Sequence, residues 1–343
     1  MEGHGLDKRF LFQIFRRAML NVPQLKRRSP SVHLLAAFSL FLILGQSAQS
    51  AVYDSAASGA VIDWDVKPHE GALPAGVSWR TFESKAAGQA VSFYVYLPPN
   101  YQSSGSKRYP VIYNLHGNGK TSFQGFEDMQ LLDEGIRDGR WPPIIVVRPN
   151  GGRTTFYKDS YDGKIPLETV VIKELIPHID STFRTIAKRQ GRCIEGYSMG
   201  GRGSTRLAMT YPELFCSLNC QAGNVPRTSE MFDQNATDSH PNNYLGPNKQ
   251  SFVDNDAFEQ LKKNIDRIRG KLRINILCGT KDPGHLVSIR DFHQELLELD
   301  VDHTYLEIED MDHDRKATMK LYSKIWFDYH VESLRRVGAL PRG

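Results

Sequence analysis

Short apolar segments alternate with longer helix-like segments along most of this 343-residue chain. We expect strands at 109–115, 144–147, 192–197, 215–221, 274–278 and 304–308. We expect helices at 127–137, 167–182, 199–211, 257–269, 285–299 and 316–329. Strands that alternate with helices build a mainly parallel sheet with helices on both faces. The pattern therefore predicts an α/β fold whose functional residues gather at the carboxyl ends of the strands.

Two further strands are expected ahead of this series, at 77–84 and 90–97. The second alternates its side chains between two faces, which favours an antiparallel hairpin at one edge of the sheet. Residues 222–254 behave differently, because they are rich in Asn, Asp, Ser, Pro and Thr and show no clear periodicity. We interpret them as a long loop that overhangs the strand ends and forms part of a substrate rim.

The N-terminus has the composition of a secretory signal peptide. Seven basic residues stand against two acidic ones in residues 1–50, an apolar run follows at 34–44, and small residues follow at 45–51. The run is short for a membrane span, although an uncleaved anchor is the alternative. We expect cleavage near Ser50, a secreted or periplasmic protein, and no stable membrane insertion afterwards. The total formal charge is +4, so the remainder is close to neutral and carries no electrostatic signature of nucleic-acid binding.

These observations divide the chain into a signal peptide at 1–50, an N-terminal lead at 51–76, one enzyme-sized domain at 77–332 and a C-terminal tail at 333–343. Four cysteines remain after the leader, Cys193, Cys216, Cys220 and Cys278. Each lies in or beside an apolar stretch, so free thiols in the core are favoured over a disulfide or a metal site.

The motif with the most specific chemistry is Gly196-Tyr197-Ser198-Met199-Gly200. It follows an expected strand and opens an expected helix, which is the context of a G-x-S-x-G nucleophile elbow. The small residues let neighbouring chain pack close to the strained turn. The helix N-terminus directs free N–H groups towards a developing oxyanion, so the Met199 N–H is a predicted oxyanion donor.

A serine nucleophile needs a base and an orienting acid, which follow the serine in the order acid, then histidine, in this type of fold. Asp282 comes directly after the strand at 274–278 and is the predicted acid, with a helix N-cap as its alternative role. His313 lies between the last strand and the last helix and is the predicted base. His285 is close to Asp282, but its place at a helix start made it the weaker candidate. No metal and no cofactor are expected, and Asp310, Asp312 and Asp314 are interpreted as solvated or helix-capping carboxylates.

The second oxyanion donor is expected in the glycine-bearing loop after the strand at 109–115. Asn118 is the preferred donor there, with Gly117 as the neighbouring candidate. His116 precedes Ser198 in the chain, so we interpret it as a structural residue of the substrate-binding loop and not as the base.

The region 77–329 resembles the putative esterase family, which includes esterase D, feruloyl esterases and acetyl xylan esterases. The matching segments lie at 94–101, 109–117, 174–180, 196–201 and 279–282. The resemblance implies an α/β-hydrolase with Ser198, Asp282 and His313 as its triad. It also implies that the segment 150–162, with Phe156, Tyr157 and Ser160, borders the active site, and Tyr157 and Ser160 are the predicted substrate contacts. Asp314-Arg315-Lys316 follow His313 where feruloyl members tend to carry an aromatic-rich helix start, so the resemblance leaves the acyl group open.

The combined prediction is an exported serine esterase that acts on acyl esters of carbohydrate, of acetyl or feruloyl type, without a cofactor. Its partners are a small-molecule or polysaccharide ester. One alternative is an acyltransferase of the same fold, which resolves the acyl-enzyme with an alcohol in place of water. The other alternative is a non-catalytic binding protein on a hydrolase scaffold.

Overall fold

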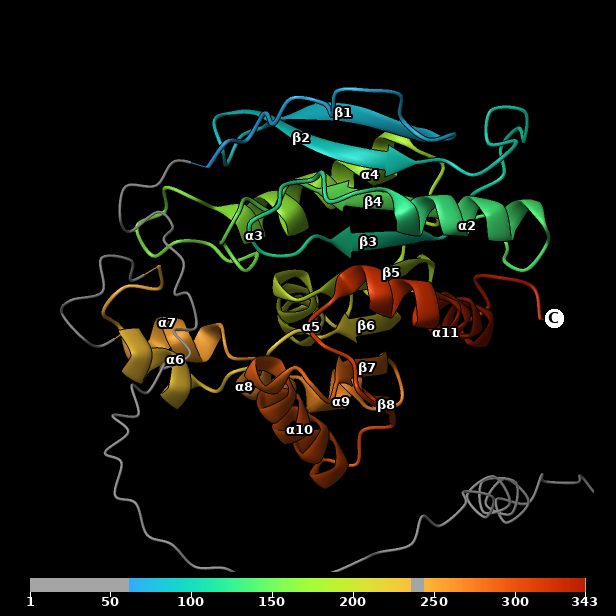
Figure 1. The fold of residues 1–343 in the computed structure, drawn as a ribbon. Helices are drawn as coiled ribbons and strands as arrows, with labels where there is room; N and C mark the ends of the chain where they lie inside the picture. The colour runs from blue at the N-terminus through green and yellow to red at the C-terminus, as the bar shows by residue number, and fades with distance from the viewer. Residues whose placement is uncertain (1–61, 236–243, 343) are drawn as a thin grey trace, which may run out of the picture. The chain divides into compact units, whose positions relative to one another are not determined.

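The computed structural model describes residues 62–235 and 244–342, which include one eight-stranded sheet with helices on both faces (Figure 1). The predicted signal peptide and residues 51–61 of the predicted lead lie outside the described residues. Within the described ranges, no helix combines the length and the apolar character needed to cross a membrane.

The sheet has the strand order β1-β2-β4-β3-β5-β6-β7-β8. Its strands are β1 (Val77–Ser84), β2 (Gln89–Tyr96), β3 (Val111–Leu115), β4 (Ile145–Pro149), β5 (Arg192–Tyr197), β6 (Ser217–Gln221), β7 (Arg273–Gly279) and β8 (His303–Ile308). The pairs β1–β2 and β2–β4 are antiparallel, and all later pairs are parallel. The predicted α/β class, the mainly parallel sheet and the N-terminal edge hairpin are therefore confirmed.

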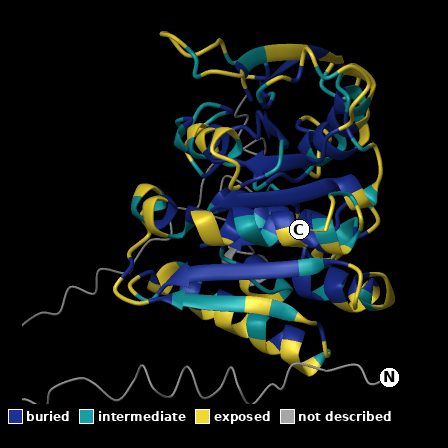
Figure 2. Ribbon diagram, turned by 90° about the vertical axis from the view of Figure 1, so that its right-hand side faces the viewer, coloured by how far each residue is buried: buried dark blue, intermediate teal, exposed yellow. Residues whose placement is uncertain are grey.

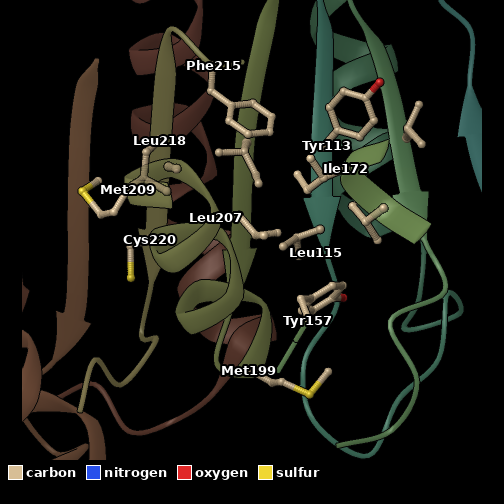
Figure 3. Packing of buried hydrophobic residues seen from close by; sticks show 14 of the residues in the cluster. Tyr113, Leu115, Tyr157, Ile172, Met199, Leu207, Met209, Phe215, Leu218 and Cys220 are labelled. Atoms are coloured by element: carbon tan, nitrogen blue, oxygen red, sulfur yellow. The ribbon is translucent and has the colours of Figure 1, made fainter. Parts of the chain in front are cut away.

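Helices cover both faces of the sheet (Figure 1). On the first face, α2 (Glu127–Arg137) and α11 (Arg315–Arg336) pack Leu132 and Phe327 into one apolar cluster. On the second face, α5 (Met199–Thr210), α8 (Ala257–Lys263) and α10 (Pro283–Glu298) contribute to a larger cluster. Figure 3 shows side chains of this cluster, including Leu207 of α5 and Leu115 of β3.

Burial follows this layered arrangement. Every residue of β3, β4, β5 and β6 is buried, whereas β1 and β8 have exposed positions because each has a neighbouring strand on one side only (Figure 2). The cysteines Cys193, Cys216, Cys220 and Cys278 are buried and unpaired, as predicted.

The structure differs from the sequence prediction in several elements. The predicted loop at 222–254 contains α6 (Thr228–Asn235) and α7 (Lys249–Asp254). Its polar composition concealed these short helices, and α7 begins with a capping bond from the Gln250 N–H to the Asn248 side chain. The helix predicted at 257–269 is interrupted at Asn264, between α8 and α9 (Ile265–Ile268).

The helix predicted at 167–182 is a succession of α3 (Leu167–Thr169), a π-helical turn η2 (Val170–Leu175) and α4 (Ile176–Thr182). Helix α11 continues to Arg336, and Leu334 is fully buried, so the predicted tail at 333–343 begins as part of the domain. The predicted lead also joins the core, because Trp64 is buried and its carbonyl accepts the Ser92 N–H at 2.8 Å. In both places apolar contacts distant in sequence extend the domain beyond its predicted bounds.

Candidate active site

Ser198 occupies the tight turn between β5 and α5. Its backbone has φ +57° and ψ −119°, and its N–H donates to the Gln221 carbonyl at 2.9 Å. Glycine is required beside it, since a Cβ atom on Gly196 would lie 2.3 Å from the Gly200 carbonyl carbon. A Cβ atom on Gly200 would lie 2.0 Å from the Leu115 oxygen. The strained serine and its two glycines form the geometry of a nucleophile elbow.

His313 connects Ser198 to Asp282. Asp282 follows β7, and His313 lies in the loop between β8 and α11. The His313 Nε2 atom is 2.8 Å from the Ser198 Oγ, and its Nδ1 atom is 2.5 Å from the Asp282 Oδ2. The parallel strands β7 and β8 bring the two loops together, and the Lys281 N–H donates to the Met311 carbonyl at 3.0 Å. A hydroxyl and an imidazole 115 positions apart in sequence are thus aligned with a carboxylate, which is the arrangement that a nucleophile, a base and an acid would need.

The charge of Asp282 is stabilised by its two histidine neighbours. Burial alone would raise the pKa of the Asp282 carboxyl, but hydrogen bonds from His285 and His313 outweigh burial and lower that pKa. An ionised Asp282 holds the His313 ring in the tautomer that leaves Nε2 free to accept the serine proton.

The model of the family described as "Putative esterase" matches residues 84–306. The chain belongs to this family. Among curated relatives, Esterase Rv1288 of Mycobacterium tuberculosis is 38% identical over 146 residues, which are 41% of this chain and 31% of that protein. The endo-1,4-beta-xylanase/feruloyl esterase of Xylanibacter ruminicola is 36% identical over 166 residues, which are 46% of this chain and 23% of that protein. The matched region is thus at most about a third of each of these relatives.

Solved structures of esterases share the fold of this family member. A ferulic acid esterase superposes with a TM-score of 0.62 at 23% identity, covering 76% of this chain and 98% of that one. An S-formylglutathione hydrolase from Agrobacterium tumefaciens superposes with a TM-score of 0.61 at 21% identity, covering 75% and 95% of the two chains. The fold of residues 77–336 is therefore that of an α/β-hydrolase.

This esterase-family site holds a second histidine that the sequence prediction placed outside the triad. His285, in the first turn of α10, directs Nδ1 to the Asp282 Oδ1 at 2.7 Å. Its ring also stacks on His313, with centroids 4.1 Å apart and planes 8° apart. The spacing of three residues from Asp282 was a usable signal, because a helix N-terminus brings residues at that spacing together.

The loop after β3 offers one of its two predicted oxyanion donors. The Gly117 N–H donates to the Gln124 Oε1 at 3.0 Å, which corrects the prediction that Gly117 is a donor. Gly119 donates to the Arg153 carbonyl at 2.7 Å. Within residues 62–235 and 244–342, no hydrogen bond engages the N–H of Asn118 or that of Met199. These two N–H groups remain the candidates for an oxyanion hole.

The predicted substrate contacts His116, Tyr157 and Ser160 are all buried, and their polar groups are used within the protein. The His116 Nε2 accepts the Gly151 N–H at 2.9 Å, and the Tyr157 hydroxyl donates to the His116 carbonyl at 3.2 Å. The Ser160 hydroxyl donates to Asp162 and accepts the Ile165 N–H. Burial lowers the pKa of His116 to about 4, so it is a neutral link between two loops. The structure thus assigns these residues to support of the site wall and corrects their role as substrate contacts.

The group Asp282, His285 and His313 offers metal-ligand atoms within 4.8 Å of one another. Both Nδ1 atoms of this group are hydrogen bonded to the Asp282 carboxylate, so a metal ion would displace the protons that the triad needs. Among the other predicted carboxylates, Asp314 caps α11 by accepting the Ala317 N–H at 3.0 Å, and Asp310 pairs with Lys281 on the surface.

Proposed function

We propose that this protein is an exported serine carboxylic-ester hydrolase in which Ser198, His313 and Asp282 form the catalytic triad. The observation that carries the proposal is the continuous chain of contacts from the Ser198 Oγ to His313 Nε2 at 2.8 Å and from His313 Nδ1 to Asp282 at 2.5 Å. Membership of the esterase family supports the same reaction class.

The mechanism follows from the positions of these groups. His313 Nε2 removes the Ser198 proton while the serine oxygen attacks the ester carbonyl. The N–H groups of Met199 and Asn118 stabilise the oxyanion, and the ionised Asp282 stabilises the imidazolium. His313 then gives its proton to the leaving alcohol, and water, activated by the same histidine, releases the acid from the acyl-enzyme.

The substrate class is proposed to be acyl esters of carbohydrate, of acetyl or feruloyl type. Support comes from the similarity to the endo-1,4-beta-xylanase/feruloyl esterase of Xylanibacter ruminicola and from the signal-like N-terminal segment. An acyltransferase is the second candidate, because the same acyl-enzyme can react with a sugar hydroxyl in place of water. A non-catalytic scaffold is disfavoured, since all three triad residues are present and aligned.

The test compares the hydrolysis of 4-nitrophenyl acetate by the purified wild-type protein with that by the Ser198→Ala variant. We expect turnover in the wild type, a loss of at least about a thousandfold in the variant, and labelling of Ser198 by a fluorophosphonate. Excess acceptor sugar then distinguishes an esterase from an acyltransferase, because a transferase forms new ester in place of free acid. A folded wild type that neither turns over ester nor takes the label would leave the scaffold as the better account.

A further inference from the structure

Among the described residues, no carboxylate lies at hydrogen-bonding distance from the buried ammonium of Lys158. Lys158 follows Tyr157 in the segment that borders the site, and only 4% of its surface is exposed. Its Nζ donates to the Met231 Sδ at 3.8 Å. A thioether is a weak acceptor, whereas a buried ammonium ordinarily pairs with a carboxylate.

Arg202 of α5 directs its guanidinium to the same sulfur atom. The Arg202 Nη2 lies 3.0 Å from the Met231 Sδ, and its guanidinium stacks over the Phe156 ring at 4.5 Å from the centroid. Two cationic side chains therefore converge on one weak acceptor. Such convergence marks a position where negative charge would be strongly stabilised.

The nearby carboxylates are occupied by other donors. Both oxygens of Asp256 accept bonds from the starts of α6 and α8, including the Thr228 hydroxyl and the Phe258 N–H. Glu168 pairs with Arg206 and accepts the Tyr211 hydroxyl. Burial first, and then the neighbouring Arg202 and Arg206, lower the pKa of Lys158 well below its ordinary value. The local excess of positive charge is thus left without a dedicated counter-ion in the described residues.

The two cations meet at a helix that begins directly after the nucleophile. The Arg202 N–H donates to the Ser198 carbonyl at 2.9 Å, so Arg202 stands one helical turn after the serine, roughly 6 Å along the helix axis. Side chains on a helix lean towards its N-terminus, which directs Arg202 back towards the turn that holds Ser198. Lys158 and Phe156 come from the loop packed against α5, where a Cβ atom on Gly203 would lie 2.6 Å from the Tyr157 ring.

We propose that Lys158 and Arg202 form a subsite for an anionic group, a carboxylate or a phosphate, carried by the ester on which Ser198 acts. The anion takes the place of the Met231 sulfur between the ammonium and the guanidinium, and the flexible methionine side chain moves aside. The claim that the bound anion belongs to an ester substrate rests on the proposed function. The claim that Lys158 and Arg202 bind an anion depends only on their geometry.

The first test measures binding without catalysis. Inorganic phosphate is titrated calorimetrically into the full chain carrying Ser198→Ala, and then into the same chain with Lys158→Met or Arg202→Met added. We expect each added substitution to weaken binding about tenfold or more, since each removes a charge-assisted hydrogen bond. Lys164→Met is the matched control, because it removes a cation of the same segment whose side chain is 73% exposed, and it should leave binding unchanged.

The second test identifies which side of the ester carries the charge. The kcat/KM for an acetylated methyl glucuronoside is compared with that for the acetylated methyl glucoside, and the monoester of adipate with 4-nitrophenol is compared with 4-nitrophenyl hexanoate. A preference for the charged uronoside places the anion on the alcohol, and a preference for the adipate ester places it on the acyl chain. In either case the charged-to-neutral ratio should fall about tenfold or more in Lys158→Met.

The outcomes separate the two proposals. Equal phosphate binding in Lys158→Met and its parent, or equal kcat/KM for charged and neutral esters in the wild type, overturns the anion subsite. If phosphate binding requires Lys158 but the protein hydrolyses no ester, the anion site is supported and the proposed esterase function is wrong. Lys158→Met is expected to fold, because it replaces a buried cation with an apolar chain of similar length. Its Tm, which should be no lower than the wild-type value, checks this.

Discussion

His285 and His313 stack in parallel, 4.1 Å apart, while their Nδ1 atoms meet different oxygens of Asp282. One carboxylate therefore orients two imidazoles, and only His313 reaches the nucleophile. Each ring restricts rotation of the carboxylate that holds the other. His285 is thus placed as a positioning residue, acting on the reaction through Asp282 and His313.

Replacing His285 by phenylalanine should keep the stack and remove the hydrogen bond to Asp282. We expect kcat to fall about tenfold, which corresponds to losing one hydrogen bond to a charged group. The acid limb of kcat/KM against pH should also move to higher pH, because the Asp282 carboxyl loses one of the two histidine donors that lower its pKa. Stopped-flow or steady-state hydrolysis of 4-nitrophenyl acetate over pH 4–9 measures both effects.

The same helix supplies a matched control for this substitution. His293 also stacks on an aromatic ring, that of Tyr305, with centroids 4.0 Å apart and planes 8° apart, but it lies away from the triad. His293→Phe should leave kcat and the pH profile unchanged. If both variants behave alike, His285 contributes to stability only and the positioning role is wrong.

Gly200→Ala should disable the elbow. The new Cβ atom would meet the Leu115 oxygen at 2.0 Å, so β3 and α5 must separate at the point that sets the serine and the oxyanion donors. We expect a loss of about 1–3 kcal/mol of stability from overpacking and a fall in kcat/KM of about a hundredfold from misplacement. Thermal unfolding and hydrolysis measure the two effects. Gly284→Ala, which meets nothing within 4 Å and has ordinary backbone, should be tolerated.

The free energy of unfolding should fall in acid partly because of Asp128. This residue pairs with the fully buried Arg148 beneath the loop that carries Gln124. Burial alone would raise the pKa of Asp128, but Arg148 and Arg315 outweigh it and lower that pKa. Stability from this carboxylate is therefore present above its unfolded pKa of about 3.9 and is lost as the pH falls through the lower folded value.

Asp128→Asn should cost about 3–5 kcal/mol at pH 7, because it leaves the Arg148 cation buried without its counter-charge. The variant should then lose less stability than the wild type as the pH is lowered towards 2. Urea unfolding at a series of pH values tests both statements. Asp138→Asn, which breaks the exposed pair with Arg140, should leave the urea midpoint nearly unchanged. Parallel pH curves for the wild type and Asp128→Asn would contradict the assignment.

Zinc should inhibit the enzyme reversibly. Asp282, His285 and His313 present ligand atoms within 4.8 Å of one another, and zinc binding there would displace the triad's protons. We expect loss of activity at micromolar to millimolar Zn²⁺, recovery with EDTA, and an inhibition constant raised at least about tenfold in His285→Phe. Equal inhibition of His285→Phe and the wild type would show that zinc acts at another place.

Local patterns predicted most of the secondary structure. The strands at 77–84 and 192–197 and the helix at 127–137 have the bounds expected from apolar periodicity. Errors arose where long-range packing decides an element's length. Leu334 is buried, and its packing in the apolar cluster formed with α2 extends α11 beyond the predicted end. Helices α6 and α7 lie in a polar segment whose composition carries no clear period, so the sequence interpretation missed them.

Part of the candidate site could likewise be predicted from local patterns in the sequence. Ser198, Asp282 and His313 each follow a strand of a parallel sheet, and such positions share one edge whatever the remaining sequence is. Gly117 was assigned to the oxyanion hole because a glycine loop suits that role, but the Gln124 side chain occupies its N–H. Burial of His116, Tyr157 and Ser160 depends on loops distant in sequence, which no local pattern reports.

The amino-acid sequence alone was sufficient for the alternation of strands and helices, the elbow motif and the three residues proposed as the triad, because these depend on short-range periodicity and on chain order. Only the tertiary structure decided which groups share Asp282, which N–H groups remain open to an oxyanion, and which cations are left without a carboxylate. Those properties depend on distances between segments far apart in the chain. His285 and His313 are 28 positions apart and Lys158 and Arg202 are 44 apart, and the fold brings the members of each pair together.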